Sequence, residues 1–166
     1  MVESMNPACS ALAESYLLSL PVAARARHVS ADYFCADAHN ANLCADAHNA
    51  NLCAALVVAG RKRATCSLAY WYLEKGERMP EQGDLLVVTD WSGLPKALVE
   101  LVSVTLCPFD EIDAAFAAEE GEGDGSLAWW HEAHKAFFER EMKAEGREFD
   151  EHATLVLERF RVVALP

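Results

Sequence analysis

"GDLLVVTDWSGLPKALVELVSVTLCPF", residues 83–109, contains the pattern that decides the fold. A β-branched run lies between the glycines at 83 and 93, and a longer run follows over 95–109. Apolar, β-branched runs bounded by glycine and proline are typical of strands. The preceding stretch 64–76, "ATCSLAYWYLEKG", is rich in small and aromatic residues and ends in a turn. We therefore expect three consecutive strands that form an antiparallel meander.

The C-terminal part adds helices and a final strand. Residues 110–126 begin with acids suited to a helix N-terminus and then break into a loop of glycines and acids. Residues 127–146, "LAWWHEAHKAFFEREMKAEG", show strong helical periodicity, and the closing "ATLVLERFRVVALP" has the composition of a strand. This order predicts an α+β fold with a small curled antiparallel sheet or barrel.

Length and composition indicate one compact domain. The chain has 166 residues, 52% of them apolar, and no unbroken apolar run near 18 residues, so we expect no membrane span. Its first residues lack the pattern of a secretory signal, which predicts a cytoplasmic location.

The six cysteines include no pair with the two-residue spacing of a zinc knuckle, and we expect reduced, mostly buried thiols.

The net charge of −12 argues against bulk attraction to nucleic acid, which normally requires a basic face. Residues 1–66 carry five acids and five bases, whereas residues 67–166 carry 21 acids and nine bases. Arg61, Lys62 and Arg63 form the only consecutive basic triplet. A polyanion is therefore expected to bind locally at that triplet.

A nine-residue block is written twice at residues 35–53, "CADAHNANLCADAHNANLC". The second copy leads into a short helix, with Asp46 as N-cap, Leu52 and Leu56 four residues apart, and Gly60 as the stop. We interpret the block as a tandem duplication, with residues 45–53 in the helix and residues 36–44 displaced to its N-terminal side as extra helix or loop. The Cys-x3-His spacing occurs in both copies, but the duplication alone explains the second pair, so a metal role is not favoured.

Four separated blocks occur in the order of a known family. "LVVAGRKRATCSL", "GDLLVVTDWSGLPKALVELVSV", "PFDEIDAAFAAEEGEGDGSLAWWHEAHKAFFERE" and "LVLERFRVV" together resemble the ASCH-domain family of the PUA-like superfamily. The resemblance covers roughly residues 33–164, including the duplicated segment 35–52, and leaves residues 1–32 as an N-terminal helical extension. It implies a PUA-like small antiparallel β-barrel flanked by helices, with a cleft beside the Gly-x-Lys-x-x-Thr segment. It also implies that relatives carry one copy of the nonamer.

The resemblance implies action on RNA or on modified nucleosides. We expect an RNA-binding protein that acts as a weak metal-assisted ribonuclease on single-stranded RNA. The alternatives are an amidohydrolase of N4-acetylcytidine and a non-catalytic RNA-binding module. A divalent ion, Mg or Mn, is the expected cofactor of cleavage, and no organic cofactor is expected.

The basic triplet supplies the first candidate site residues. Lys62 matches the family's lysine, which can bind phosphate as a point charge or, if desolvation lowers its pKa, accept a proton. Arg61, Lys62 and Arg63 are the predicted RNA contacts. Thr65 matches the nucleophile of the amidohydrolase branch and needs a neighbouring base, for which Lys62 is the candidate. Thr65 can equally be a β-branched residue that opens a strand. As a loop residue, Lys62 is expected to be exposed.

The acidic loop supplies the other candidates. Like-charge repulsion among its carboxylates can raise one pKa, or Glu120, Glu122 and Asp124 can bind a hard cation through oxygen ligands. The resemblance places a catalytic glutamate in this region, and we select Glu122, with Glu120 as the alternative. Ser126 can face the cleft or act as the N-cap of the long helix.

Aromatic residues offer flat surfaces on which bases can stack, but most such residues are core. The candidates are Trp71, Trp91, Trp129 and Trp130, with Tyr70 and Tyr72. Trp130, His134, Phe137 and Phe138 occupy neighbouring helical positions, which favours packing over ligand contact. His131 and His134 lie at a metal-binding spacing, without a third ligand evident in the sequence.

Overall fold

The computed structural model describes residues 5–34 and 47–166. Helices and strands follow in the order α1 (Pro7–Ser19), η1 (Val22–Ala24), β1 (Val29–Asp32), α2 (Ala47–Val58), β2 (Ala64–Leu68), α3 (Tyr70–Leu73), β3 (Leu85–Thr89), β4 (Pro95–Pro108), η2 (Phe109–Glu111), α4 (Ala114–Glu120), α5 (Leu127–Ala144) and β5 (Thr154–Ala164). No helix in these residues is long and apolar enough to cross a membrane. The predicted α+β class is confirmed.

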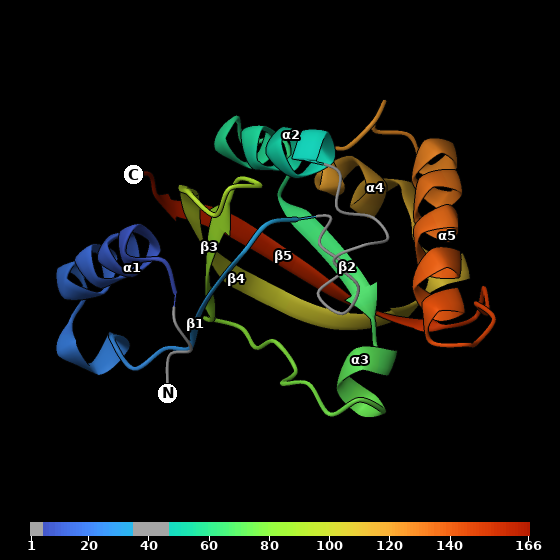
Figure 1. Ribbon diagram of the computed structural model, residues 1–166, viewed down its shortest axis with the longest axis horizontal. Coiled ribbons are helices and arrows are strands. Elements are labelled where there is room, and N and C mark those ends of the chain that lie inside the picture. Colours follow the sequence, from blue (N-terminus) through green and yellow to red (C-terminus); the bar gives the residue numbers. More distant parts are fainter. Residues whose placement is uncertain (1–4, 35–46) are drawn as a thin grey trace.

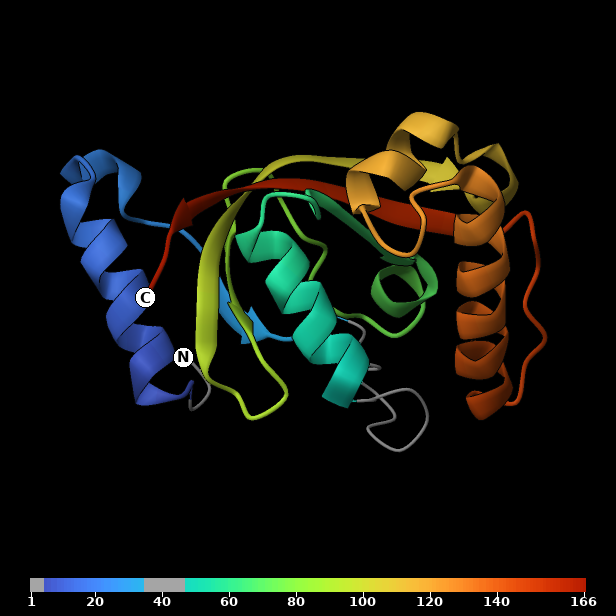
Figure 2. The same ribbon diagram turned by 90° about the horizontal axis from the view of Figure 1, so that it is seen from above.

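The strands form one curled sheet in the order β1-β3-β4-β5-β2, which makes a half-barrel (Figure 1). Strands β4 and β5 pair over most of their length, from Leu98↔Ala164 to Pro108↔Thr154. Their register shifts twice, and such irregularities bend and twist a sheet. The helices α1 and α5 lie at opposite ends of the molecule's long axis, with β4 and β5 running between them (Figures 1 and 2).

The predicted antiparallel meander of three consecutive strands is wrong in two respects. Strands β3 and β4 form the expected hairpin, but β2 ends at Leu68 and is followed by the short helix α3 instead of continuing. β2 then pairs with β5 at the opposite edge of the sheet from β1. The sheet is also not purely antiparallel, because β1 runs parallel to β3. The short 90–94 turn makes β3 and β4 pair with each other. The longer connection between β2 and β3, residues 69–84, permits β2 to pair with β5, which is distant in the chain.

The N-terminal range 1–32, predicted as a helical extension, contains helix α1 and also the edge strand β1. Cys9 and Ala13 of α1 pack in one buried cluster with Leu85, Val87 and Leu98 of the sheet. The range is therefore built into the same sheet as the rest of the chain.

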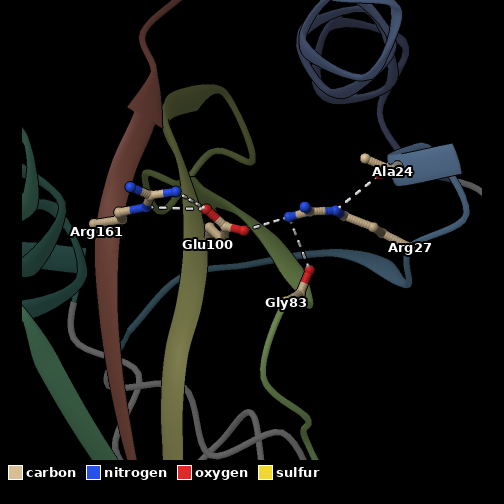
Figure 3. Close-up of polar contacts among 5 residues, drawn as sticks. All are labelled: Ala24, Arg27, Gly83, Glu100 and Arg161. Atoms are coloured by element: carbon tan, nitrogen blue, oxygen red, sulfur yellow. Dashed lines mark hydrogen bonds and ion pairs between the residues drawn. The ribbon is translucent and has the colours of Figure 1, made fainter. Parts of the chain in front are cut away.

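A charged network also joins this range to the sheet. Figure 3 shows the carboxylate of Glu100 between two guanidinium groups, with Arg27 on one side and Arg161 on the other. Arg161 binds Glu100 at 2.6 and 3.0 Å, and Arg27 also donates to the carbonyl oxygens of Ala24 and Gly83. Arg27 thereby connects the segment before β1 to the middle of β4.

Two further cores lie under the helices. One packs Trp130 and Phe138 of α5 with Phe109, Phe116 and Leu155, which confirms the predicted packing role of Trp130 and Phe138. The other, which includes Val57 of α2, Phe34 and Phe160, lies between α2 and the sheet. The segment from Gly60 to β2 connects Val57 of the second core to Ala64 of the first, and it carries the site described next.

Candidate active site

The Gly-x-Lys-x-x-Thr segment turns sharply at the end of α2. Gly60 has a φ of 72°, a conformation that favours glycine, and the amides of Arg61 and Lys62 both donate to the carbonyl of Leu56. Gly60 therefore terminates the helix as predicted. Residues 47–53 of the second nonamer copy lie in this helix, whereas Asp46 and residues 36–44 fall outside the described residues.

The basic triplet does not form one surface patch. Arg61 and Arg63 are exposed, but the side chain of Lys62 is only 1% exposed and points into the molecule. The amide of Arg63 donates to the carbonyl of Glu119, and the carbonyl of Arg63 accepts from the amide of Phe160. These two bonds hold the segment between α4 and β5. The expectation that Lys62 is an exposed loop residue is therefore wrong.

Lys62 lies between two glutamates from the predicted acidic loop. Its ammonium nitrogen is 2.5 Å from Glu122 Oε1 and 3.3 Å from Glu120 Oε2, and it also lies over the ring of Phe34 at 5.2 Å. Gly121 separates the two glutamates at φ 66°, and a Cβ there would meet the carbonyl oxygen of Arg61 at 2.4 Å. Only glycine lets the end of α4 approach the Lys62 segment this closely.

These contacts fix the charge states of the cluster. Burial acts to lower the pKa of Lys62, but the negative charges of Glu122 and Glu120 outweigh it and hold that pKa above its ordinary value. Burial likewise acts to raise the pKa of Glu120, yet Lys62 and His134 lower it to about 2. Lys62 is therefore a protonated hydrogen-bond donor, which contradicts the expected lowered pKa and a role as the resting base.

His134 joins the same cluster from α5. Its Nε2 is 3.2 Å from Glu120 Oε2, while Nδ1 is 3.0 Å from the carbonyl of Trp130, on whose ring it stacks at 4.1 Å. The predicted packing role of His134 is confirmed, but the sequence pattern did not show its contact with Glu120. The sequence feature that could have predicted this orientation is the four-residue spacing of Trp130 and His134, which places the two rings on one face of the helix.

The predicted oxygen cage for a divalent ion does not assemble. Asp124 is exposed and accepts from the amide of Ser126, and in the described part of the chain it joins no group of potential ligands. The group whose ligand atoms all lie within 4.8 Å of one another consists instead of Cys66, Glu120 and His134. Such sulfur and nitrogen donors suit zinc better than Mg or Mn. The ammonium of Lys62 already neutralises the Glu120 carboxylate in this group, and burial raises the pKa of the Cys66 thiol.

Ser126 acts as the N-cap of α5, because its side chain accepts from the amide of Trp129 at 3.1 Å. Its hydroxyl is exposed at the helix end, so the structure supports the capping role over the catalytic one.

A cavity of about 780 Å³ opens beside the cluster. Thr65 and Ser67 of β2 line it, together with Glu120, Glu122 and Trp129. Trp91, in contrast, is exposed in the β3–β4 turn, and Trp130 is core. Of the predicted site residues, the structure thus brings together Lys62, Glu120 and Glu122, and places Thr65 on the wall of the same cavity.

One carboxylate on the cavity wall was missed by the sequence analysis. Glu158 of β5 lines the cavity and lies directly opposite Thr65 in the strand register. The available signal was its position as an acid inside the apolar run "LVLERF". A polar residue in a central strand needs an explanation that packing does not give.

Comparisons with known proteins identify the family and the fold. The family model described as ASCH domain matches residues 39–164. An ASCH domain from Lactobacillus crispatus JV V101 is similar in structure, with a TM-score of 0.86 and 47% identity, covering 96% of each chain. A protein from Enterococcus faecalis V583 is similar at a TM-score of 0.78 and 26% identity, covering 95% of this chain and 88% of its own. No curated protein sequence matches. With a family model matched over most of its length and a relative at 47% identity, this chain belongs to the ASCH domain family.

Proposed function

We propose that this protein hydrolyses the acyl amide of a small modified nucleoside, with N4-acetylcytidine as the substrate to test. The observation that carries the proposal is the 2.5 Å contact between Lys62 and Glu122 beside a cavity that Thr65 lines. Lys62 and Thr65 match the lysine and threonine that the resemblance to the amidohydrolase branch implies, and Glu122 is our choice for its glutamate, with Glu120 as the alternative.

The charge of the cavity supports a small neutral substrate. Five of the carboxylates on its wall are Asp84, Glu120, Glu122, Glu141 and Glu158. A phosphodiester chain would be repelled by such a wall, whereas an uncharged nucleoside would not. The volume of about 780 Å³ lies in the range of ordinary small-molecule sites.

The reaction uses these groups in two steps. The Oγ of Thr65 attacks the acyl carbon, the bond from carbon to N4 breaks, and N4 leaves as an amine after gaining a proton. Water then cleaves the acyl-threonine ester and releases the carboxylic acid. The ammonium of Lys62, held by Glu122, donates to the oxygen that gains negative charge in both steps.

Metal-assisted cleavage of single-stranded RNA is less well supported by the same geometry. The oxygen ligands proposed for Mg or Mn do not converge, and Lys62 is turned inward and paired. Arg61 and Arg63 stay exposed on either side of it, which supports RNA contact at the surface as the second candidate function.

One assay pair tests the proposal. The protein is incubated with N4-acetylcytidine and, separately, with labelled single-stranded RNA, each with Mn²⁺ or with EDTA. We expect deacetylation that EDTA does not change, and no RNA cleavage. Thr65→Val and Lys62→Met should each remove deacetylation, whereas Arg63→Ala should keep it. Metal-dependent RNA cleavage without deacetylation would instead support the ribonuclease.

A further inference from the structure

Glu158 is an acid outside the Lys62 cluster that lies opposite Thr65 in the strand register. It is the register partner of Thr65 across β2 and β5 and of Val104 across β4 and β5. Directly opposite residues in antiparallel strands present their side chains on the same face, with Cβ atoms about 4.5–5.5 Å apart. Both Thr65 and Glu158 line the cavity. The side chains of Glu158 and Thr65 are therefore neighbours on one face of the sheet, at the wall of the same cavity.

The Glu158 carboxyl has no cation or hydrogen-bond donor from the residues described at 5–34 and 47–166. Three other acids on the cavity wall have cationic partners: Lys62 binds Glu120 and Glu122, and Arg78 binds Asp84 at 2.6 Å. An acid kept on a sheet face without a partner costs stability and so indicates a function. Burial, with a smaller effect of the nearby Asp84 charge, raises the pKa of Glu158 to about 7.

We propose that Glu158 is the general base for Thr65, a role that rests on the proposed hydrolysis. The Glu158 carboxylate accepts the hydroxyl proton of Thr65 as Oγ bonds to the acyl carbon. It then gives this proton to N4 as the bond from carbon to N4 breaks. In the second step it accepts a proton from the attacking water, and the proton returns to Thr65 Oγ as the ester breaks.

The protonation states of Lys62 and Glu158 support the assignment of Glu158, and not Lys62, as the base. Lys62 is a fixed cation between two carboxylates, so it has no lone pair with which to accept the Thr65 proton. Glu122 and Glu120 are engaged by that cation. Glu158 titrates near neutral pH, where a general base is most effective. Titratable groups near Glu158 in the described part of the chain include Asp84 and Tyr72, whose hydroxyl is 2.9 Å from Ser67 Oγ. Glu77 and Glu141 act on Tyr72 as well and line the same cavity.

The test compares Glu158→Gln with the wild type and with Glu119→Gln. Glu119 is a matched control because it binds Arg159 outside the cavity lining. With N4-acetylcytidine, Glu158→Gln should lower kcat by about 100-fold to 10,000-fold and change KM little. The wild-type rate should rise with pH through about 7, where the carboxylate forms, and this rise should be absent in Glu158→Gln. Glu158→Asp keeps the carboxyl and should retain part of the activity, provided that thermal melting shows both variants folded.

A second readout does not need the natural substrate. The protein is treated with p-nitrophenyl acetate, and acetylation of Thr65 is followed by mass spectrometry. We expect labelling of Thr65 in the wild type and in Glu119→Gln, and at least 10-fold slower labelling in Glu158→Gln. Equal labelling in Glu158→Gln, or no labelling of Thr65 in the folded wild type, would overturn the role of Glu158. If labelling depends on Glu158 but N4-acetylcytidine is not hydrolysed, the base assignment stands and the proposed substrate is wrong.

Discussion

Lys62 is a buried cation as well as a candidate site residue, and replacing it tests whether its ion pairs with Glu120 and Glu122 stabilise the fold. Lys62→Ala would leave the carboxylate of Glu120, which is 1% exposed, without its ammonium partner. Breaking a buried ion pair from one side costs about 3–5 kcal/mol. We expect a loss of that size in the free energy of unfolding measured with urea, against less than about 0.5 kcal/mol for the exposed Arg63→Ala. Equal stability of the two variants would show that Lys62 is solvated in solution.

At the scale of elements, the close approach of α4 to the Lys62 segment depends on Gly121. Gly121→Ala would place a Cβ 2.4 Å from the Arg61 carbonyl oxygen, whereas Gly146→Ala meets nothing within 4 Å at a similar φ of 70°. Both variants incur about 1 kcal/mol or more for a side chain at positive φ. Gly121→Ala should lose about 1–3 kcal/mol more, as overpacked sites do, and its activity should fall because Lys62 shifts. Thermal melting and deacetylation assays of the pair would test this, and equal losses would contradict it.

The duplicated nonamer gives a second prediction about a single element, helix α2. Helix α2 already contains residues 47–53 of the second copy, so deletion of residues 36–44 leaves its sequence unchanged. We expect the shortened protein to keep its fold and activity and to unfold at a higher temperature, because fewer residues need ordering. Replacement of residues 36–44 by a Gly/Ser segment of equal length serves as the control for chain length. A deletion protein that does not fold would show that the first copy is required.

For the whole molecule, the net charge of −12 sets the expected behaviour toward RNA. Of the predicted contacts, Arg61 and Arg63 remain exposed while Lys62 is buried. Two phosphate contacts on a single strand predict a slope of about −1.4 in a plot of log affinity against log salt concentration. We expect weak binding of labelled RNA with this slope by fluorescence anisotropy, and loss of binding in the double variant Arg61→Ala and Arg63→Ala. A slope several times steeper would indicate a larger basic surface.

Local patterns in the sequence determined the elements and the motif. The helix over α5, the hairpin of β3 and β4 and the stop at Gly60 follow from spacing and from glycine positions within a few residues. The family resemblance, not a local pattern, implied that the Gly-x-Lys-x-x-Thr segment and the acidic loop belong to one site, and Lys62 does meet Glu120 and Glu122.

Only the tertiary structure decided the pairing of β2 with β5, the inward turn of Lys62 and the position of Glu158 beside Thr65. Each of these depends on contacts between residues far apart in the chain, which no local periodicity encodes. Thr65 and Glu158 become neighbours because β5 returns along β2 after the long helix. Lys62 stays a cation, although it is buried, because the end of α4 brings the carboxylates of Glu120 and Glu122 to its ammonium group. The sequence by itself therefore determined the motif that contains Lys62 and Thr65 and the acidic segment that meets it, whereas packing decided their protonation, their partners and the place of Glu158.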